Sequence, residues 1–383
     1  MGDSLFSPLT IRGTTFKNRI VTSPMWQYRG EDGFASDWHL MHLGRFAEGG
    51  AALVFQEATT VDPLARGTAG DIGIWDDAFV PGLSRIVDVI HEGGALAGIQ
   101  LGHPGRKARR LPPWHGPSVP DGTVDDPSWQ LLAPSPPRRA QEALPWTVMT
   151  LGDIARVKDL WRGAVCRAVV AGYDVIEIHA AHGYLLHTFL SPESNTREDD
   201  YGGSFEGRVR LLREIVTDAR EIWPADKPLF VRLSCVDGAG WTMRETLLLT
   251  HILTELGVDV IDCSSGGLTN SSLAGTPPTY GYQVPYAEEV KRNTPAKSMA
   301  VGLIVHPSQA HQIIAGEQAD LVALGRELLL NPSWPIDAAR KLGVDVKFDS
   351  LPPRLGYWLN RRAETVAGLQ TSTDGFIEVP WRT

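Results

Sequence analysis

Short apolar runs rich in β-branched residues alternate with longer stretches of helical periodicity along most of the chain. Eight runs have the length and composition of buried strands, at 19–25, 51–59, 95–101, 174–179, 228–234, 258–264, 298–304 and 319–325. Helical periodicity fills several of the gaps between them, at 37–50, 79–94, 151–172 and 205–223. Nearly continuous apolar strands require a sheet that is covered on both faces, so the pattern predicts an α/β fold, a parallel (β/α)8 TIM barrel.

Three segments lie outside this repeat. Residues 1–18 predict a short hairpin, "LTIRGTTF", that plugs the N-terminal end of the barrel. Residues 103–150 are rich in Pro, Gly and Trp and leave the third strand at the C-terminal face, where barrel enzymes keep their active sites, so we expect a capping excursion. We therefore expect a barrel domain at 1–343, and a tail at 344–383 whose aromatic and arginine content indicates a subunit interface.

The composition and charge of the chain indicate which classes of binding partner to expect. The chain has 383 residues, 43% of them hydrophobic, and a net charge of -9, which gives no long-range attraction for nucleic acid or an anionic membrane. The basic cluster "GRKARR" at 105–110 predicts a solvated loop face or a local anion contact. Three scattered cysteines and the lack of a long apolar run predict a soluble protein of the reducing cytoplasm that takes a small molecule.

The predicted strand ends carry the candidate chemistry. His179, His182 and Tyr184 follow the fourth strand in "HAAHGY". Glycines after the seventh and eighth strands, followed by an arginine, favour a phosphate site, because barrels commonly bind phosphate there: Gly302, Gly325 and Arg326.

Two common barrel chemistries do not fit. A Schiff-base or pyridoxal phosphate enzyme needs a lysine at a strand end, and none is so placed; His179 and His182 alone make a poor metal site, so we expect no metal. FMN would use the residues that remain. Arg232 could stabilise the negative charge of reduced flavin, and Gln100 could match the pyrimidine edge with a donor and an acceptor.

Each of these residues has a structural alternative when it is taken alone. A single histidine after a strand is more often a hydrogen-bonded core residue, and Arg232 could be a salt-bridge partner for Asp262 or Glu57. The tryptophans of the excursion are expected to pack within the cap: Trp114, Trp129 and Trp146. What outweighs these alternatives is the combination, since several unlike residues at different strand ends all suit one cofactor.

With these residues assembled, the chain resembles the old yellow enzyme family of FMN-dependent ene-reductases, and its xenobiotic reductase and thermophilic-like branch in particular. The resemblance covers Leu5 to about Gly343, and its most specific motif is "DVIEIHAAHGYLLHTFLSPESNTREDDYGGSFEGRVRLLREIV". It implies that the flavin ring contacts Pro24, Met25, Ala58, Gln100 and Arg232. It implies that the phosphate lies at Gly302, Gly325 and Arg326.

The resemblance also implies roles toward the substrate. His179 and His182 would bind the activating oxygen of an enone, maleimide or nitroalkene, and Tyr184 would protonate Cα while hydride reaches Cβ. Tyr28 would contact the ligand from the other side. NADPH or NADH would use the same pocket first, which agrees with the lack of an early GxGxxG motif.

One residue departs from the family pattern. Trp26 stands where this branch usually has a cysteine near the flavin. Either it narrows the pocket and alters the flavin potential, or it turns into the barrel wall. In the tail, Trp358, with Arg354 as second candidate, would enter the pocket of a neighbouring subunit in a homodimer or homotetramer, or would pack on its own barrel.

Two other classes of function stay open. One is a different flavin reaction, such as demethylation, dienoyl-CoA reduction or a biosynthetic isomerisation, although the cysteine cluster of the dienoyl-CoA enzymes is absent from the sequence. The other is a non-catalytic barrel that binds FMN or another phosphorylated ligand. The physiological substrate and the choice between NADPH and NADH do not follow from the sequence.

Overall fold

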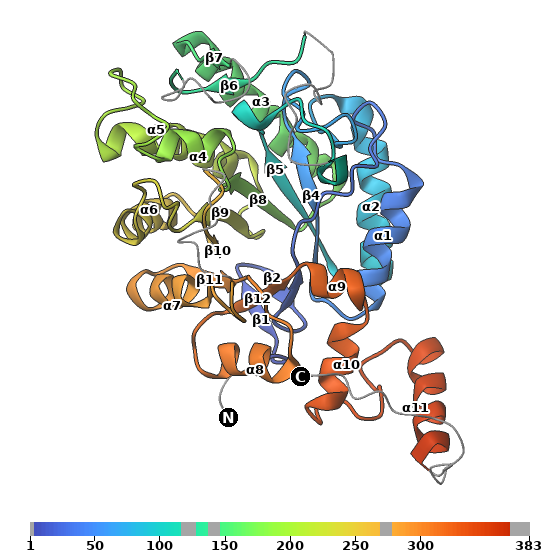
Figure 1. Cartoon of the computed structure of the whole chain (residues 1–383). Coiled ribbons are helices and arrows are strands. Elements are labelled where there is room, and N and C mark those ends of the chain that lie inside the picture. The colour runs from blue at the N-terminus through green and yellow to red at the C-terminus, as the bar shows by residue number, and fades with distance from the viewer. Residues whose placement is uncertain (1–3, 116–127, 137–145, 269–277, 368–383) are drawn as a thin grey trace. The chain divides into compact units, whose positions relative to one another are not determined.

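A computed structural model of the protein describes residues 4–115, 128–136, 146–268 and 278–367. The chain divides into two compact units, Met1–Pro335 and Ile336–Thr383. The first contains a closed barrel with helices outside it (Figure 1), and the second contains α11 (Pro353–Ala367). Among the described residues, no helix is long and apolar enough to cross a membrane.

Eight parallel strands close the barrel in the order β10-β11-β12-β3-β4-β5-β8-β9. Their bounds are β3 (Ile20–Thr22), β4 (Leu53–Thr60), β5 (Leu96–Gly102), β8 (Val175–Ala180), β9 (Leu229–Ser234), β10 (Val260–Ser264), β11 (Lys297–Ala300) and β12 (Leu321–Leu324). The predicted (β/α)8 barrel is confirmed, with a strand in each of the eight expected ranges.

Two strands, β3 and β11, end several residues before the point that the sequence pattern predicts. β3 ends before Pro24, which has no N–H to donate to a neighbouring strand. β11 ends before Gly302 and Leu303, whose φ angles of 109° and 50° take the chain out of the extended conformation. In both places the chain leaves the barrel early and frees backbone at its C-terminal face.

Helices of the first unit lie outside the barrel, and several of them begin with side-chain caps. In chain order they are α1 (Asp37–Glu48), α2 (Val80–Glu92), α3 (Leu151–Ala171), α4 (Leu185–Leu190), α5 (Phe205–Ile222), α6 (Met243–Glu255), α7 (Val284–Asn293), α8 (Pro307–Ala315) and α9 (Arg326–Leu330). A further helix, α10 (Trp334–Lys341), spans the boundary between the two units. Thr150 with Asp153, and Thr242 with Glu245, form capping boxes that satisfy the first N–H groups of α3 and α6. These side chains fix where each helix starts against its strand.

The N-terminal hairpin closes the bottom of the barrel. β1 (Leu9–Ile11) pairs antiparallel with β2 (Thr14–Phe16), as predicted. Ile11 and Phe16 join one buried cluster with residues from the beginnings of the barrel strands, among them Leu53, Val175 and Phe230. The lower half of the barrel is therefore solid apolar core, and the polar inward residues stand above it, toward the C-terminal face.

A bulge in β4 changes which side chains face inward near that end. Gln56 pairs with Ile99 and Ala58 with Gln100, so Glu57 is an extra residue in the ladder. As a result Ala58, the single half-buried position of β4, lies beside Gln100. Part of the predicted cap is described as well: β6 (Leu132–Ala133) pairs with β7 (Thr147–Val148), while residues 116–127 and 137–145 fall outside the described part.

Candidate active site

Two histidines and a tyrosine meet at the end of β8. The rings of His179 and His182 lie 5.3 Å apart, and the rings of His179 and Tyr184 lie 4.9 Å apart. His182 has a φ of 60°, a left-handed conformation that reverses the chain immediately after the strand. This turn brings Tyr184 back over His179, so the three residues predicted from "HAAHGY" form one cluster.

Side chains of neighbouring strands hold this turn. Ser234 Oγ accepts a hydrogen bond from the His182 N–H at 3.0 Å, and Ser264 Oγ lies 2.6 Å from His182 Nε2. Lys107 Nζ donates to the carbonyl oxygens of His182 and Gly267, each at 2.5 Å. Lys107, which belongs to the basic cluster 105–110, is therefore half-buried and has a structural role. For this residue the expectation of a solvated loop face is wrong.

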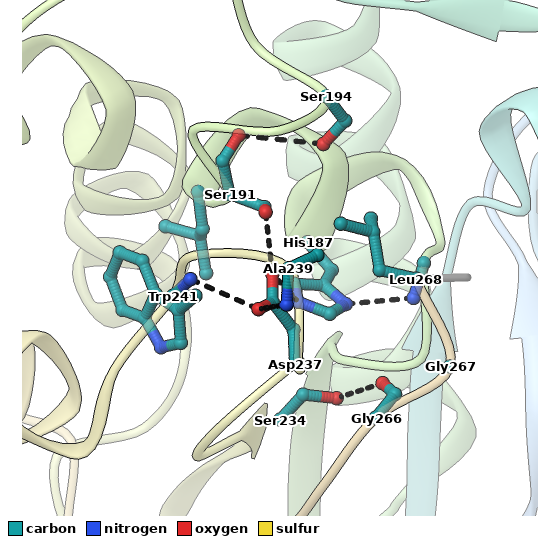
Figure 2. A network of polar contacts seen from close by, with 12 residues as sticks. His187, Ser191, Ser194, Ser234, Asp237, Ala239, Trp241, Gly266, Gly267 and Leu268 are labelled. Atoms are coloured by element: carbon teal, nitrogen blue, oxygen red, sulfur yellow. Dashed lines mark hydrogen bonds and ion pairs between the residues drawn. The ribbon is translucent and has the colours of Figure 1, made fainter. Parts of the chain in front are cut away.

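A buried polar network lies under the same turn. Figure 2 shows His187 and Asp237 at its centre: His187 Nδ1 accepts from the Gly183 N–H at 2.8 Å, and Asp237 accepts from Ser191 Oγ at 2.5 Å. Asp237 also accepts the N–H groups of Ala239 and Trp241, so it ties the start of α6 to α4. Burial, with Lys107 and Arg106 nearby, lowers the pKa of His187 to about 3, which keeps its ring a neutral acceptor for Gly183.

The protonation states of His179, His182 and Tyr184 allow all three side chains to donate hydrogen bonds. Burial and then the positive charge of Arg232 hold the pKa of both His179 and His182 well below its usual range. Burial, followed by the charge of Asp71, raises the pKa of Tyr184. At neutral pH the cluster thus contains two neutral imidazoles and a protonated phenol, each able to donate a hydrogen bond.

Aromatic rings form a wall beside this cluster. The Trp26 indole meets Tyr184 edge to face at 5.4 Å and tilts against Tyr28 at 6.1 Å. Trp26 Nε1 donates to the Ala58 carbonyl oxygen at 2.9 Å, which ties the loop after β3 to the end of β4. Trp114 meets Tyr28 at 5.2 Å, so this residue of the excursion reaches the site and does not pack only within the cap.

The residues predicted to contact a flavin ring all stand at the same end of the barrel. Pro24 and Met25 follow β3, and strand register sets Ala58 beside Gln100 and His179 beside Arg232. Arg232 Nε lies 3.2 Å from Asp262 Oδ2, which confirms the expected pairing with Asp262. Glu57 does not take part in it, because its carboxylate lies 3.7 Å from His39 Nε2 and accepts from the Gln27 N–H.

The predicted phosphate residues follow the last two strands. Gly302 comes after β11, and Gly325 is the residue from which α9 begins. Gly302 has a φ of 109°, a conformation that favours glycine, and a Cβ atom there would also lie 2.7 Å from the end of the Gln283 side chain. The Arg326 side chain is exposed, and within the described part of the chain it has no hydrogen-bond or ion-pair partner.

One predicted site residue belongs to the second unit. Trp358 lies on α11, is 68% exposed, and meets Tyr357 edge to face at 5.1 Å.

Known proteins resemble this chain over most of its length. Residues 4–344 match the NADH:flavin oxidoreductase / NADH oxidase family. The chain belongs to that family. It is 43% identical over 350 residues to an NADPH dehydrogenase of Geobacillus sp. (strain WCH70), and the match covers 90% of this chain and 96% of that one. The resemblance to the old yellow enzymes stated above is thereby confirmed.

Solved structures agree with the assignment. Morphinone reductase in complex with tetrahydroNAD matches with a TM-score of 0.73 at 25% identity, covering 90% of this chain and 92% of that chain. An old yellow enzyme homologue from Zymomonas mobilis shares the fold with a TM-score of 0.72 at 24% identity, covering 88% and 93%. The protein is thus an NAD(P)H-dependent oxidoreductase with FMN as its cofactor.

The site has the features that FMN requires. The partly exposed backbone at Gly302 and the guanidinium of Arg326, which has no partner among the described residues, suit a phosphate group. Arg232 brings a positive charge to the end of the barrel where half-buried Ala58 lies beside buried Gln100. The sequence offered no reason to assign a role to Ser234 or Ser264, which position His182, because serines at strand ends carry no pattern that separates them from ordinary turn residues.

Proposed function

We propose that this flavin oxidoreductase is an ene-reductase that reduces carbon–carbon double bonds activated by a carbonyl, imide or nitro group. The observation that carries the proposal is the convergence of Tyr184, His179 and His182 beside Arg232 at the open end of the barrel. FMN would supply the redox chemistry when bound, namely the transfer of hydride from NADPH or NADH to Cβ of the alkene. The chain's own residues bind the substrate, polarise it and supply the proton.

The cofactor would be held by residues on or just after six strands, β3, β4, β5, β9, β11 and β12. The ring would be held by Pro24, Met25, Ala58, Gln100 and Arg232, and the phosphate by Gly302, Gly325 and Arg326. Arg232 would stabilise the negative charge that the ring gains on reduction, because a guanidinium stays charged at every physiological pH.

His179 and His182 would donate hydrogen bonds to the activating oxygen. His179 Nδ1 accepts from the Ala181 N–H at 3.4 Å, which leaves the hydrogen on Nε2 as the free donor. If Ser264 donates to His182 Nε2, the second histidine carries its hydrogen on Nδ1 and donates there. Two neutral donors stabilise a developing oxyanion without protonating it, so the negative charge stays available at Cα.

Tyr184 would then protonate Cα. Its phenol is protonated well beyond neutral pH, and its ring is fixed between Trp26 and His179. A positioned acid of this kind contributes about 10²–10⁴-fold to a reaction. Tyr28 and Trp26 would contact the substrate from the opposite side, and one pocket would serve the nicotinamide first and the alkene second.

Assembly and location complete the proposal. The exposed aromatic pair Tyr357 and Trp358 on α11 supports a subunit interface, in which Trp358 would reach a neighbour's pocket in a homodimer or homotetramer. The three cysteines are free, as expected of a cytoplasmic protein. Sedimentation of Trp358→Ala beside the parent protein tests the assembly.

The deciding experiment follows the visible flavin spectrum without oxygen. NADPH should bleach the bound flavin, and 2-cyclohexenone or N-ethylmaleimide should restore its colour, with reduced product detected by mass spectrometry. A flavin that bleaches but is not reoxidised by any activated alkene would contradict ene-reduction and favour another flavin reaction. A flavin that NADPH does not bleach would favour a binding barrel without turnover.

A further inference from the structure

Two carboxyl groups are buried inside the barrel, in the polar layer above its apolar core. Glu177 stands on β8 and Asp262 on β10, and neither exposes any surface to solvent. β9 runs between these two strands and contributes Arg232, which pairs in register with Asp262. The layer therefore contains two carboxyl groups and one guanidinium.

The hydrogen bonds of this layer leave acceptor atoms unsatisfied. Glu177 Oε1 accepts from Gln100 Nε2 at 2.7 Å, but Glu177 Oε2 and both Asp262 oxygens have no donor in the described structure. Arg232 Nε is near enough to Asp262 Oδ2, at 3.2 Å, for an ion pair, but the N–H does not point at the oxygen in hydrogen-bond geometry. The two side chains interact, so that each carboxyl group shifts the pKa of the other.

A single proton between the two carboxyl groups removes this conflict. Two ionised carboxylates in contact and out of water would repel each other and leave oxygens without donors. One bound proton gives the pair a donor, cancels the repulsion and leaves one negative charge opposite Arg232. Among the described titratable side chains near the layer, His179 and His182 are neutral, and burial raises the pKa of the Cys263 thiol, which stays protonated. The charge of Lys107 acts on the two histidines and is not among the causes that shift the pKa of either carboxyl group.

The surroundings decide which carboxyl group keeps the proton. Burial and the charge of Asp262 raise the pKa of Glu177 well above its usual range. Burial also raises the pKa of Asp262. Arg232 acts to lower the pKa of both groups, but its Nε lies 3.2 Å from Asp262 Oδ2, whereas Glu177 receives only the neutral amide of Gln100. Asp262 is therefore the better site for the negative charge, and Glu177 is the better site for the proton.

We propose that Glu177 is a neutral, protonated acid that donates to an ionised Asp262, and that the resulting Asp262–Arg232 pair sets the reduction potential of the flavin. This rests on the proposed contact between Arg232 and the flavin ring. Neither carboxyl group touches the cofactor in this arrangement. Both are positioning residues that act through Arg232, whose positive charge toward the ring is partly offset by Asp262.

The two amide variants then have opposite predicted effects. Glu177→Gln replaces a neutral acid by a neutral amide of the same shape, which can still donate to Asp262 and accept from Gln100. Asp262→Asn removes the only negative charge of the layer and leaves Arg232 uncompensated. The stronger positive charge should stabilise the negative charge that the flavin ring gains on reduction, and so should raise the midpoint potential.

The test measures the FMN midpoint potential of parent, Glu177→Gln and Asp262→Asn by anaerobic dye titration, a readout that needs no alkene turnover. We expect an upward shift in Asp262→Asn and no shift in Glu177→Gln. A comparable upward shift in both variants would mean that both carboxyl groups are charged, and would overturn the proposal. An unchanged potential in both variants would overturn it as well.

Infrared spectroscopy of the flavin-free protein tests the protonation of Glu177 directly. It depends neither on the proposed function nor on whether Asp262→Asn is stable. A protonated carboxylic acid has a C=O stretching band separate from the bands of carboxylates. At neutral pH we expect the difference spectrum of parent minus Glu177→Gln to show such a C=O band, which separates Glu177 from other protonated carboxyl groups such as Asp71. A difference spectrum with carboxylate bands and no C=O band would show Glu177 to be ionised and would overturn the proposal even if ene-reduction were confirmed.

Discussion

The indole N–H of Trp26 donates to the carbonyl oxygen of Ala58 at 2.9 Å. This bond fixes the largest side chain of the loop after β3 at the end of β4, where its ring contacts Tyr28 and Tyr184. Of the two hypotheses for Trp26, the geometry favours the one in which the indole narrows the pocket, because a ring turned into the barrel wall could not meet both tyrosines.

Replacing Trp26 should therefore change substrate size preference. Trp26→Cys opens the space beside Tyr184, and we expect kcat/KM for bulky alkenes to rise about tenfold relative to 2-cyclohexenone, the scale of a few methylene groups in an apolar pocket. Trp26→Phe is the matched control, since it keeps an aromatic wall and loses only the bond to Ala58. Equal selectivity ratios in parent and Trp26→Cys would place the indole outside the substrate pocket.

Tyr184→Phe should separate the two half-reactions. The substitution keeps the ring contacts with Trp26 and His179 and removes only the acidic hydroxyl group. We expect stopped-flow traces to show flavin reduction by NADPH at the parental rate and reoxidation by 2-cyclohexenone slower by about 10²–10⁴-fold. Tyr28→Phe serves as control, and a reoxidation rate unaffected by Tyr184→Phe would assign the proton to another donor.

Gly302→Ala should weaken FMN binding. The residue has a φ of 109°, and the added Cβ would meet the Gln283 side-chain amide at 2.7 Å. A strained backbone of this kind costs about 1–3 kcal/mol, so the dissociation constant should rise about 10–100-fold. Fluorescence titration of flavin-free protein measures it. Gly82→Ala, on α2 with no atom within 4 Å of the added carbon, should bind FMN as the parent does.

Removing the His187 ring nitrogen should loosen the catalytic turn. In His187→Phe the buried Gly183 N–H loses its acceptor, which costs about 1–3 kcal/mol of unfolding free energy. Urea unfolding measures this loss, and reoxidation by alkene should slow because Gly183 lies between His182 and Tyr184. The exposed His251 offers the control substitution His251→Asn, and equal stability of His187→Phe and parent would contradict the role assigned to this network.

Asp71 should make the protein less stable as pH rises through the neutral range. Burial, with a further contribution from the charge of Glu57, raises its folded pKa from 3.8 to about 7. Between those values the folded protein holds a proton that the unfolded chain has released, so the free energy of unfolding falls as pH increases. From pH 5 to pH 8 this contribution amounts to about 2–3 kcal/mol.

Asp71→Asn isolates that contribution. The variant cannot ionise at this position, so its stability relative to the parent should improve between pH 5 and pH 8, as measured by urea unfolding at both values. Asp32→Asn, at an exposed carboxyl group, should follow the parent at both. A parallel pH dependence in parent and Asp71→Asn would show that Asp71 is already ionised at pH 5.

The sequence predicted the barrel and its chemistry better than its fine structure. Strand order and the cluster around Tyr184 follow from local patterns, because parallel strands bring their C-terminal ends to one face. The bulge at Glu57 was not predictable, because one extra residue does not change the apolar pattern of a strand that is buried on both faces. The bonds of Lys107 to two backbone carbonyls were not predictable either, because they depend on loops that are far apart in sequence. A basic cluster alone indicates a solvated surface.

The closure of the barrel between β12 and β3 has a consequence for how the protein is made. The last strand pairs with the first, Val322 with Ile20, so no closed barrel exists until nearly all of the first unit has been synthesised. Gly325 and Arg326 follow that strand directly, and the proposed ring contacts begin at Pro24. A chain still growing on the ribosome would therefore hold only fragments of the flavin site, and cofactor loading would follow translation.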